Sequence, residues 1–187
     1  SVYFYASAGY KYHEFTLIDK KQICPGSYEM FSLPIFSTNS IRIYSEGENI
    51  SRMEKIKTLV NYAPSYKYLN VCLRADDNCG ICEKCIRTLL AIDAAGAIEK
   101  YYLVFNIEYY KSNKKWYLQM LVYSYLRKKH DYIELYPYFK KEINLIIKII
   151  AFLKFLKSSI KESMLFKKFK KTQIGLLLKK LIKPKKI

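Results

Sequence analysis

Two short runs near the N-terminal end of the chain alternate in the character of successive side chains. Residues 1–6 read SVYFYA and place valine, phenylalanine and alanine on one face, and residues 40–47 read SIRIYSEG and alternate isoleucine with arginine and tyrosine. A period of two predicts strands. A third run, YLNVCLR at 68–74, is also rich in β-forming residues and predicts a strand that carries Cys72 at its end.

Two later segments have the 3.6-residue periodicity of amphipathic helices. In the first, Ser51 and Glu54 have the spacing of a capping box, and the apolar positions that follow share one stripe up to Pro64. The second segment, CIRTLLAIDAAG at 85–96, has apolar side chains on one face and ends at Gly96, a residue type favoured at helix C-termini. Together these patterns predict an α/β fold that is rich in helix.

The basic residues concentrate at the C-terminal end. The whole chain carries a net charge of +17, and residues 139–187 hold fifteen Lys and two Glu, a net charge of +13 that leaves +4 for residues 1–138. Pro137 marks the change, and a boundary is expected near it, within ELYPYFKKE at 134–142. We therefore expect three parts, residues 1–100 with the strands and cysteines, a helical extension at 101–138, and a basic helical tail at 139–187. Further helices are expected near 114–128 and over much of 139–180.

Composition excludes a disordered chain, because 51% of the residues are hydrophobic and 19 are tyrosine. No secretory leader pattern is present, so we expect a cytoplasmic protein, in which clustered cysteines stay reduced and favour metal binding or redox chemistry. Ser1 is not an initiator methionine and already begins a predicted strand. We therefore expect a further part of the protein upstream.

Four of the five cysteines lie within fourteen residues. Cys72, Cys79, Cys82 and Cys85 form the pattern C-x6-C-x2-C-x2-C. A C-x2-C turn brings two thiolates to one side of a loop, and four thiolates at about 2.3 Å satisfy tetrahedral zinc and leave no coordination position open. The spacing favours a structural zinc site. An iron–sulfur cluster and free thiols without metal are the alternatives.

The run LNVCLRADDNCGICEKCIRTLLAIDAAG at 69–96 resembles the C-terminal segment of PP-loop ATP pyrophosphatase-like proteins. This is the adenine nucleotide alpha hydrolase (HUP) superfamily, which includes 7-cyano-7-deazaguanine synthase, where a comparable run of four cysteines holds zinc. The resemblance extends upstream to Gly26 and Ser27, to the strand at 40–47, and to a Ser-Arg-x-x-Lys pattern. It covers about residues 1–100 and implies the C-terminal portion of a HUP-like α/β domain with a four-cysteine zinc knuckle, followed by helices.

The family's Ser-Gly-Gly-x-Asp-Ser nucleotide-binding loop is absent, and the chain contains no Gly-Gly pair. The resemblance therefore implies a zinc-binding C-terminal fragment of an ATP-dependent enzyme that adenylates a small-molecule substrate, with the catalytic half upstream of Ser1. ATP is then a cofactor only if that half is present. We expect the isolated chain to be inactive.

The family's Ser-Arg-x-x-Lys pattern falls on Ser51, Arg52 and Lys55. These residues form the first turn of the predicted helix, where backbone N–H groups and the helix dipole favour anions. The resemblance implies that Arg52 and Lys55 face the nucleotide or the substrate. A solvated basic turn is the alternative reading.

The tail has a wide apolar face over residues 141–161, interrupted by Lys148 and Lys154. No stretch of about 18 uncharged apolar residues exists, so we expect no membrane span. Residues 165–187 alternate apolar and lysine pairs. Such a tail is typical of a packed helix with a frayed basic end, of a helix on an anionic membrane surface, or of a nucleic-acid-binding segment.

The tail leaves two functions open beside the enzyme fragment. One is a zinc-stabilised adaptor at a membrane surface, which would make the protein a peripheral membrane protein. The other is a zinc-dependent nucleic-acid-binding module, which we favour less because the basic residues are remote from the cysteines and no C2H2 spacing exists.

Overall fold

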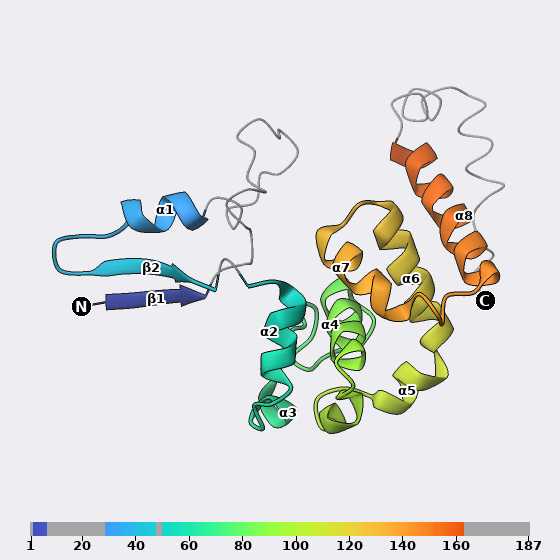
Figure 1. Cartoon of the computed structure of the whole chain (residues 1–187), viewed down its shortest axis with the longest axis horizontal. Helices are drawn as coiled ribbons and strands as arrows, with labels where there is room; N and C mark the ends of the chain where they lie inside the picture. The colour runs from blue at the N-terminus through green and yellow to red at the C-terminus, as the bar shows by residue number, and fades with distance from the viewer. Residues whose placement is uncertain (1, 7–28, 48–49, 163–187) are drawn as a thin grey trace. The chain divides into compact units, whose positions relative to one another are not determined.

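The computed structural model describes residues 2–6, 29–47 and 50–162 (Figure 1). The fifth cysteine, Cys24, lies outside these ranges, as do Gly26, Ser27 and the tail beyond Glu162. In chain order, the elements are β1 (Val2–Ala6), α1 (Glu29–Ile35), β2 (Arg42–Glu46), α2 (Arg52–Leu59), α3 (Ser65–Tyr68), α4 (Glu83–Ala94), the 3-10 helix η3 (Ile98–Tyr101), α5 (Ile107–Ser112), α6 (Lys114–Leu126), α7 (His130–Phe139) and α8 (Leu145–Glu162). The described residues are predominantly helical, which confirms the helix-rich part of the predicted fold. They divide after Tyr66 into two compact units, here called unit 1 and unit 2.

Unit 1 contains both strands that the alternating patterns predict. β1 and β2 pair in parallel, with Val2 opposite Arg42 and Ala6 opposite Glu46. Parallel strands need a crossover connection, and the chain between them includes α1, which contacts β2. The hydroxyl of Ser37, after α1, accepts a hydrogen bond from the β2 backbone N–H of Ile43 (2.9 Å). This bond ties the crossover to the sheet.

α2 begins with the predicted capping box. The Ser51 hydroxyl accepts a hydrogen bond from the Glu54 N–H (3.3 Å), and the Glu54 carboxylate accepts one from the Ser51 N–H (2.8 Å). At the other end of the helix, the Tyr66 hydroxyl donates to the Val60 carbonyl (2.6 Å). At both ends of α2, side chains therefore form hydrogen bonds with backbone groups that have no partner within the helix.

The predicted third strand at residues 68–74 is wrong. α3 ends at Tyr68, and the following residues form a loop. The Asn70 side-chain oxygen accepts a hydrogen bond from the Cys72 N–H (3.0 Å), and the Asn78 side-chain oxygen accepts one from the Val71 N–H (2.9 Å). Asparagine side chains thus take the backbone donors that a strand would offer to a neighbour.

Unit 2 is built around α4, which contacts η3, α6 and α7 (Figure 1). Seven α4 residues are buried: Cys85, Ile86, Thr88, Leu89, Leu90, Ala91 and Ile92. The helix ends as its sequence predicts, because Gly96 has φ +71° and donates to the Asp93 carbonyl, while Ala97 donates to the Ile92 carbonyl. This pair of bonds is a Schellman C-cap, which glycine favours.

Tyrosines fill much of the core of unit 2. Four of them are at most 2% exposed: Tyr101, Tyr110, Tyr117 and Tyr132. Buried tyrosine hydroxyls need partners. The Tyr110 hydroxyl donates to the Asp93 carboxylate (2.6 Å), and the Lys114 ammonium pairs with the same carboxylate. Tyr110 of α5 and Lys114 of α6 therefore link their helices to Asp93 near the end of α4.

Pro137, which marks the predicted boundary between body and tail, does not end a helix. It lies inside α7, which continues to Phe139. Proline there removes only the hydrogen bond to the Ile133 carbonyl, and burial of Leu135 and Phe139 holds the last turn in place. Beyond α7, α8 packs along α6. Within the described ranges, no helix is long and apolar enough to cross a bilayer.

Candidate metal centre

The four clustered cysteines lie together in unit 2. Their sulfur atoms are all within 4.8 Å of one another, with 4.0 Å between those of Cys72 and Cys82 and 3.9 Å between those of Cys79 and Cys85. A tetrahedron of thiolates at about 2.3 Å from one zinc ion separates the sulfurs by about 3.8 Å. The arrangement therefore has the size of a site for a single ion.

Loop and helix contribute equally to the cluster. Cys72 and Cys79 lie in the loop before α4, Cys82 is the N-cap of α4, and Cys85 is in its first turn. Three sulfurs accept backbone hydrogen bonds of 3.4 Å, Cys72 from Arg74, Cys79 from Cys82, and Cys82 from Cys85. These N–H donors and the positive end of the helix dipole stabilise negative charge on the sulfurs.

The surroundings of the thiols shift their pKa values in different directions. Backbone hydrogen bonds from Cys79 and Arg74 lower the pKa of Cys72 to about 6. Burial raises the pKa of Cys85, which is fully buried. Because neighbouring thiolates repel each other, the full set of four thiolates needs a cation between them, and a divalent metal supplies that charge.

A glycine shapes the turn between the second and third cysteines. Gly80 has φ +72°, a conformation that residues with a Cβ rarely adopt. Its carbonyl accepts a hydrogen bond from the hydroxyl of Tyr117 on α6 (2.9 Å). Burial raises the pKa of Tyr117 to about 12, so the hydroxyl stays protonated and remains a donor. Helix α6 thus holds the cysteine turn from outside.

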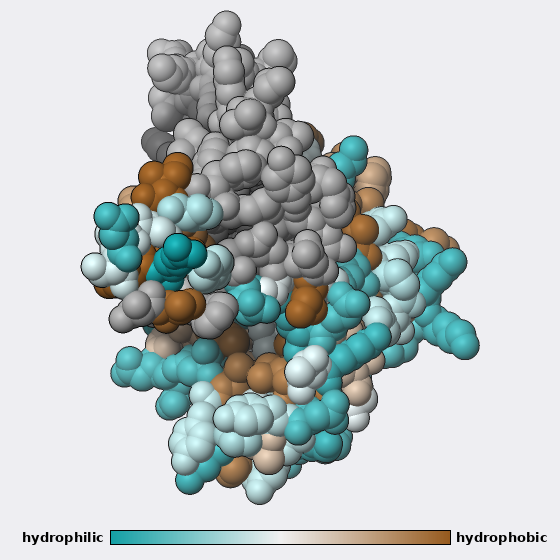
Figure 2. Space-filling model, turned by 60° about the vertical axis from the view of Figure 1, so that its left-hand side comes forward, coloured by the Kyte–Doolittle hydropathy of each residue, from teal (hydrophilic) through white to brown (hydrophobic). Residues whose placement is uncertain are grey.

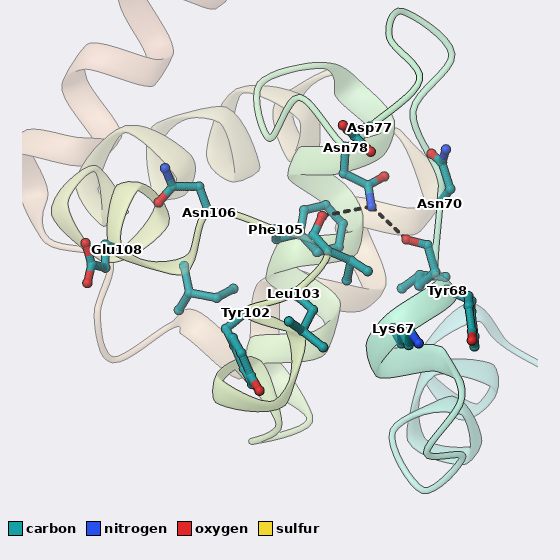
Figure 3. Close-up of a pocket in the computed structure, with 13 residues that line it drawn as sticks. Lys67, Tyr68, Asn70, Asp77, Asn78, Tyr102, Leu103, Phe105, Asn106 and Glu108 are labelled. Atoms are coloured by element: carbon teal, nitrogen blue, oxygen red, sulfur yellow. Dashed lines mark hydrogen bonds between the residues drawn. The ribbon is translucent and has the colours of Figure 1, made fainter.

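Asn78 fixes the loop that joins Cys72 to Cys79. Its amide nitrogen donates to the carbonyls of Leu69 (2.7 Å) and Val104 (3.1 Å), as the dashed lines of Figure 3 show. Its oxygen accepts from Val71, so both ends of the amide are used. Asn78 lines an open pocket of about 660 Å³ between this loop and the segment after η3. Asn78 was not predicted from the sequence as a functional residue, although it lies in the loop between the cysteines, next to the candidate ligand Cys79.

α7 braces the first turns of α4. Lys129 pairs with Glu83 (2.6 Å), and Arg87 pairs with Asp131. The Tyr132 hydroxyl donates to the Glu83 carbonyl (3.4 Å). The two acidic partners come from different helices, so the contacts fix α7 against the end of α4 that carries Cys82 and Cys85.

The other predicted site residues lie elsewhere. Arg52 and Lys55 are on α2 in unit 1, and both side chains are partly buried. The Lys55 side chain lies beside Gly47, 3.4 Å from the position that a Cβ of this glycine would occupy. The four cysteines all belong to unit 2. A role of Arg52 and Lys55 in binding a nucleotide or a substrate stays a prediction.

Comparison of the chain with family models, with curated proteins and with solved structures finds no match. The functional assignment therefore rests on the chemistry of the cysteine cluster, on the sequence resemblance at residues 69–96, and on the surfaces of the described residues.

Proposed function

We propose that Cys72, Cys79, Cys82 and Cys85 bind one structural zinc ion. The observation that carries this proposal is the mutual proximity of the four sulfurs, all within 4.8 Å. Four protein thiolates fill a tetrahedral ion, so no position remains for an activated water or a substrate. The ion would join the loop to α4 and stabilise unit 2.

The sulfur spacing favours zinc over an iron–sulfur cluster. Such a cluster places several iron and sulfide atoms between the thiolates and so spreads the cysteine sulfurs around a larger core. The sulfur pairs at 3.9 and 4.0 Å suit a single central ion instead. Elemental analysis of the purified chain is expected to give about one zinc per chain and no stoichiometric iron. Iron with inorganic sulfide, or metal-free protein that melts at the same temperature as the zinc-loaded form, would contradict the assignment.

We further propose that the chain is the zinc-braced C-terminal part of a PP-loop-type, HUP-like enzyme that adenylates a small molecule with ATP. The resemblance of residues 69–96 to that superfamily supports this proposal. The parallel pairing of β1 and β2 across α1 is compatible with it, since parallel strands with helical crossovers build α/β domains. Arg52 and Lys55 are the candidate contacts to nucleotide or substrate phosphate.

If the gene extends upstream of Ser1, its full product tests the enzyme proposal. That product should contain a Ser-Gly-Gly-x-Asp-Ser loop and release pyrophosphate from ATP, whereas residues 1–187 alone should not turn over ATP. Arg52→Ala in the longer product is expected to reduce turnover without releasing zinc. ATP turnover by the isolated chain would refute the fragment reading, and an upstream sequence without such a loop would favour the adaptor function instead.

A further inference from the structure

One side of helix α8 packs against α6. Ile147 and Ala151 are at most 3% exposed on the side that packs along α6. Two polar contacts add to this packing. The Lys154 ammonium donates to the Gln119 side chain (3.1 Å), and the Arg127 guanidinium donates to the Ser158 hydroxyl (3.2 Å). The orientation of α8 about its axis is therefore fixed within unit 2.

The opposite side of α8 is apolar and exposed. Seven large hydrophobic side chains on it are between 39% and 71% exposed: Leu145, Ile146, Ile149, Phe152, Leu153, Leu156 and Ile160. At 100° per residue they fall within an arc of about 120°, and Lys148 and Lys157 lie at its two borders. We call these seven residues the α8 apolar face.

This stripe differs from ordinary surface hydrophobicity. Single exposed apolar side chains are common on proteins, and Figure 2 shows such brown groups interspersed with hydrophilic ones. The α8 apolar face is instead a continuous stripe on one rigid helix about 27 Å long. Contiguous apolar surface of this kind marks an interaction site.

The surrounding charge identifies the partner. Lys148 and Lys157 are exposed beside the stripe. The sequence after Glu162 adds nine lysines and no acidic residue. An apolar stripe bordered by lysines matches the interface of a bilayer with anionic headgroups, where the stripe enters the acyl boundary and the lysines reach the phosphates. An acidic apolar groove on a protein is the other surface with this chemistry, and it would be favoured if the unmodified chain bound neither kind of vesicle.

We propose that the α8 apolar face docks unit 2 on an anionic membrane surface, with α8 lying in the plane of the interface and α6 behind it. The side of α8 that carries Ile147 and Ala151 packs against α6, and the opposite side contacts the lipid. The proposal is independent of the enzymatic assignment and of zinc, so zinc content serves as a separate readout of intact structure.

The test uses the full chain and sedimentation with two kinds of vesicle, pure phosphatidylcholine and phosphatidylcholine with 30% phosphatidylserine. Ile149→Gln/Leu153→Gln removes two side chains from the α8 apolar face without a change in charge. Leu103→Gln/Ile133→Gln is the matched control, because Leu103 and Ile133 have similar exposure elsewhere on unit 2. We expect the first variant to bind the anionic vesicles roughly tenfold more weakly or worse, since it loses the transfer of two apolar side chains from water into the acyl boundary. The control should bind like the unmodified chain.

Removal of residues 163–187 separates the helix from the basic segment that follows it. A cut after Glu162 leaves the described core of unit 2 intact, whereas a cut after Tyr138 would remove the buried residues Phe139, Ile143 and Ile147. We expect the shortened chain to bind anionic vesicles more weakly at low salt but to keep a salt-resistant part that the Ile149→Gln/Leu153→Gln change removes.

Three further results would overturn the proposal. The first is unchanged vesicle binding by the Ile149→Gln/Leu153→Gln variant. The second is a dimer in light scattering, without vesicles, that this variant dissociates, because the face would then bind a second copy. The third is equal binding to both kinds of vesicle by the unmodified chain, because anionic headgroups would then have no role.

Discussion

At the scale of single residues, Asn78 shows how a side chain outside the cysteine cluster can define the shape of a candidate metal site. Its amide makes one accepted and two donated hydrogen bonds, and these join three separate backbone segments around the Cys72–Cys79 loop. No other side chain of the same shape has this set of one acceptor and two donors, because aspartate offers acceptors alone. The loop therefore depends on the amide as well as on the thiols.

Replacing Asn78 by Asp is expected to destabilise unit 2. The substitution loses both donors and places a carboxylate against the carbonyls of Leu69 and Val104, so we expect a loss of about 1–3 kcal/mol in the free energy of unfolding. Denaturant unfolding of the zinc-loaded chain measures it. Asn106→Asp is the matched control, because Asn106 is the N-cap of α5 and aspartate keeps the acceptor that it uses. Equal stability of the two variants would show that the Asn78 amide is dispensable.

At the scale of elements, the sequence predicted what local chemistry decides. The capping box at Ser51 located the start of α2, and Gly96 located the end of α4, because each signal acts within one helical turn. The cysteine spacing likewise predicted which thiols would meet. The strand expected at 68–74 failed because Asn70 and Asn78 bind its backbone, and this competition is invisible to a pattern of β-forming residues. The bond from Tyr117 to Gly80 joins positions 37 residues apart, and no local signal predicts it.

Cys82 combines two roles at the start of α4, and substitution separates them. Its sulfur is a candidate zinc ligand and also accepts the N-cap hydrogen bond from the Cys85 N–H. Serine is a favoured N-cap, so Cys82→Ser keeps the cap and loses the thiolate, whereas Cys82→Ala loses both. We expect both variants to bind less zinc and to melt at a lower temperature. The alanine variant should lose about 1 kcal/mol more in the free energy of unfolding, because it also lacks the N-cap acceptor. Elemental analysis and thermal unfolding measure the two effects. Full zinc content in either variant would contradict the four-thiolate site.

At the scale of the whole molecule, the candidate metal centre and the predicted phosphate contacts belong to different compact units. The cysteines, the tyrosine core and α8 are in unit 2, while the parallel strands and α2 are in unit 1. Within unit 2, the cysteine loop is linked to α6 through Tyr117, and the first turn of α4 is linked to α7 through Glu83. Removal of a bound metal should therefore destabilise α6 and α7 as well as the cysteine loop, because these contacts link them.

Hydrogen exchange of the chain with and without a zinc chelator tests how far a bound metal stabilises the structure. Structural zinc contributes on the order of 10 kcal/mol in zinc-finger peptides, and a zinc ion bound by the four cysteines would contribute its free energy where the loop meets α4. We expect chelation to speed amide exchange at residues 71–94 by more than tenfold, with smaller increases in α6 and α7, because local opening there follows the loss of their contacts to the cysteine turn and α4. Exchange in β1 and β2 serves as the internal control and should change little, and added zinc should restore the original rates. Uniform acceleration across both units would mean that the metal stabilises the chain as one cooperative body, and unchanged exchange at 71–94 would remove its structural role.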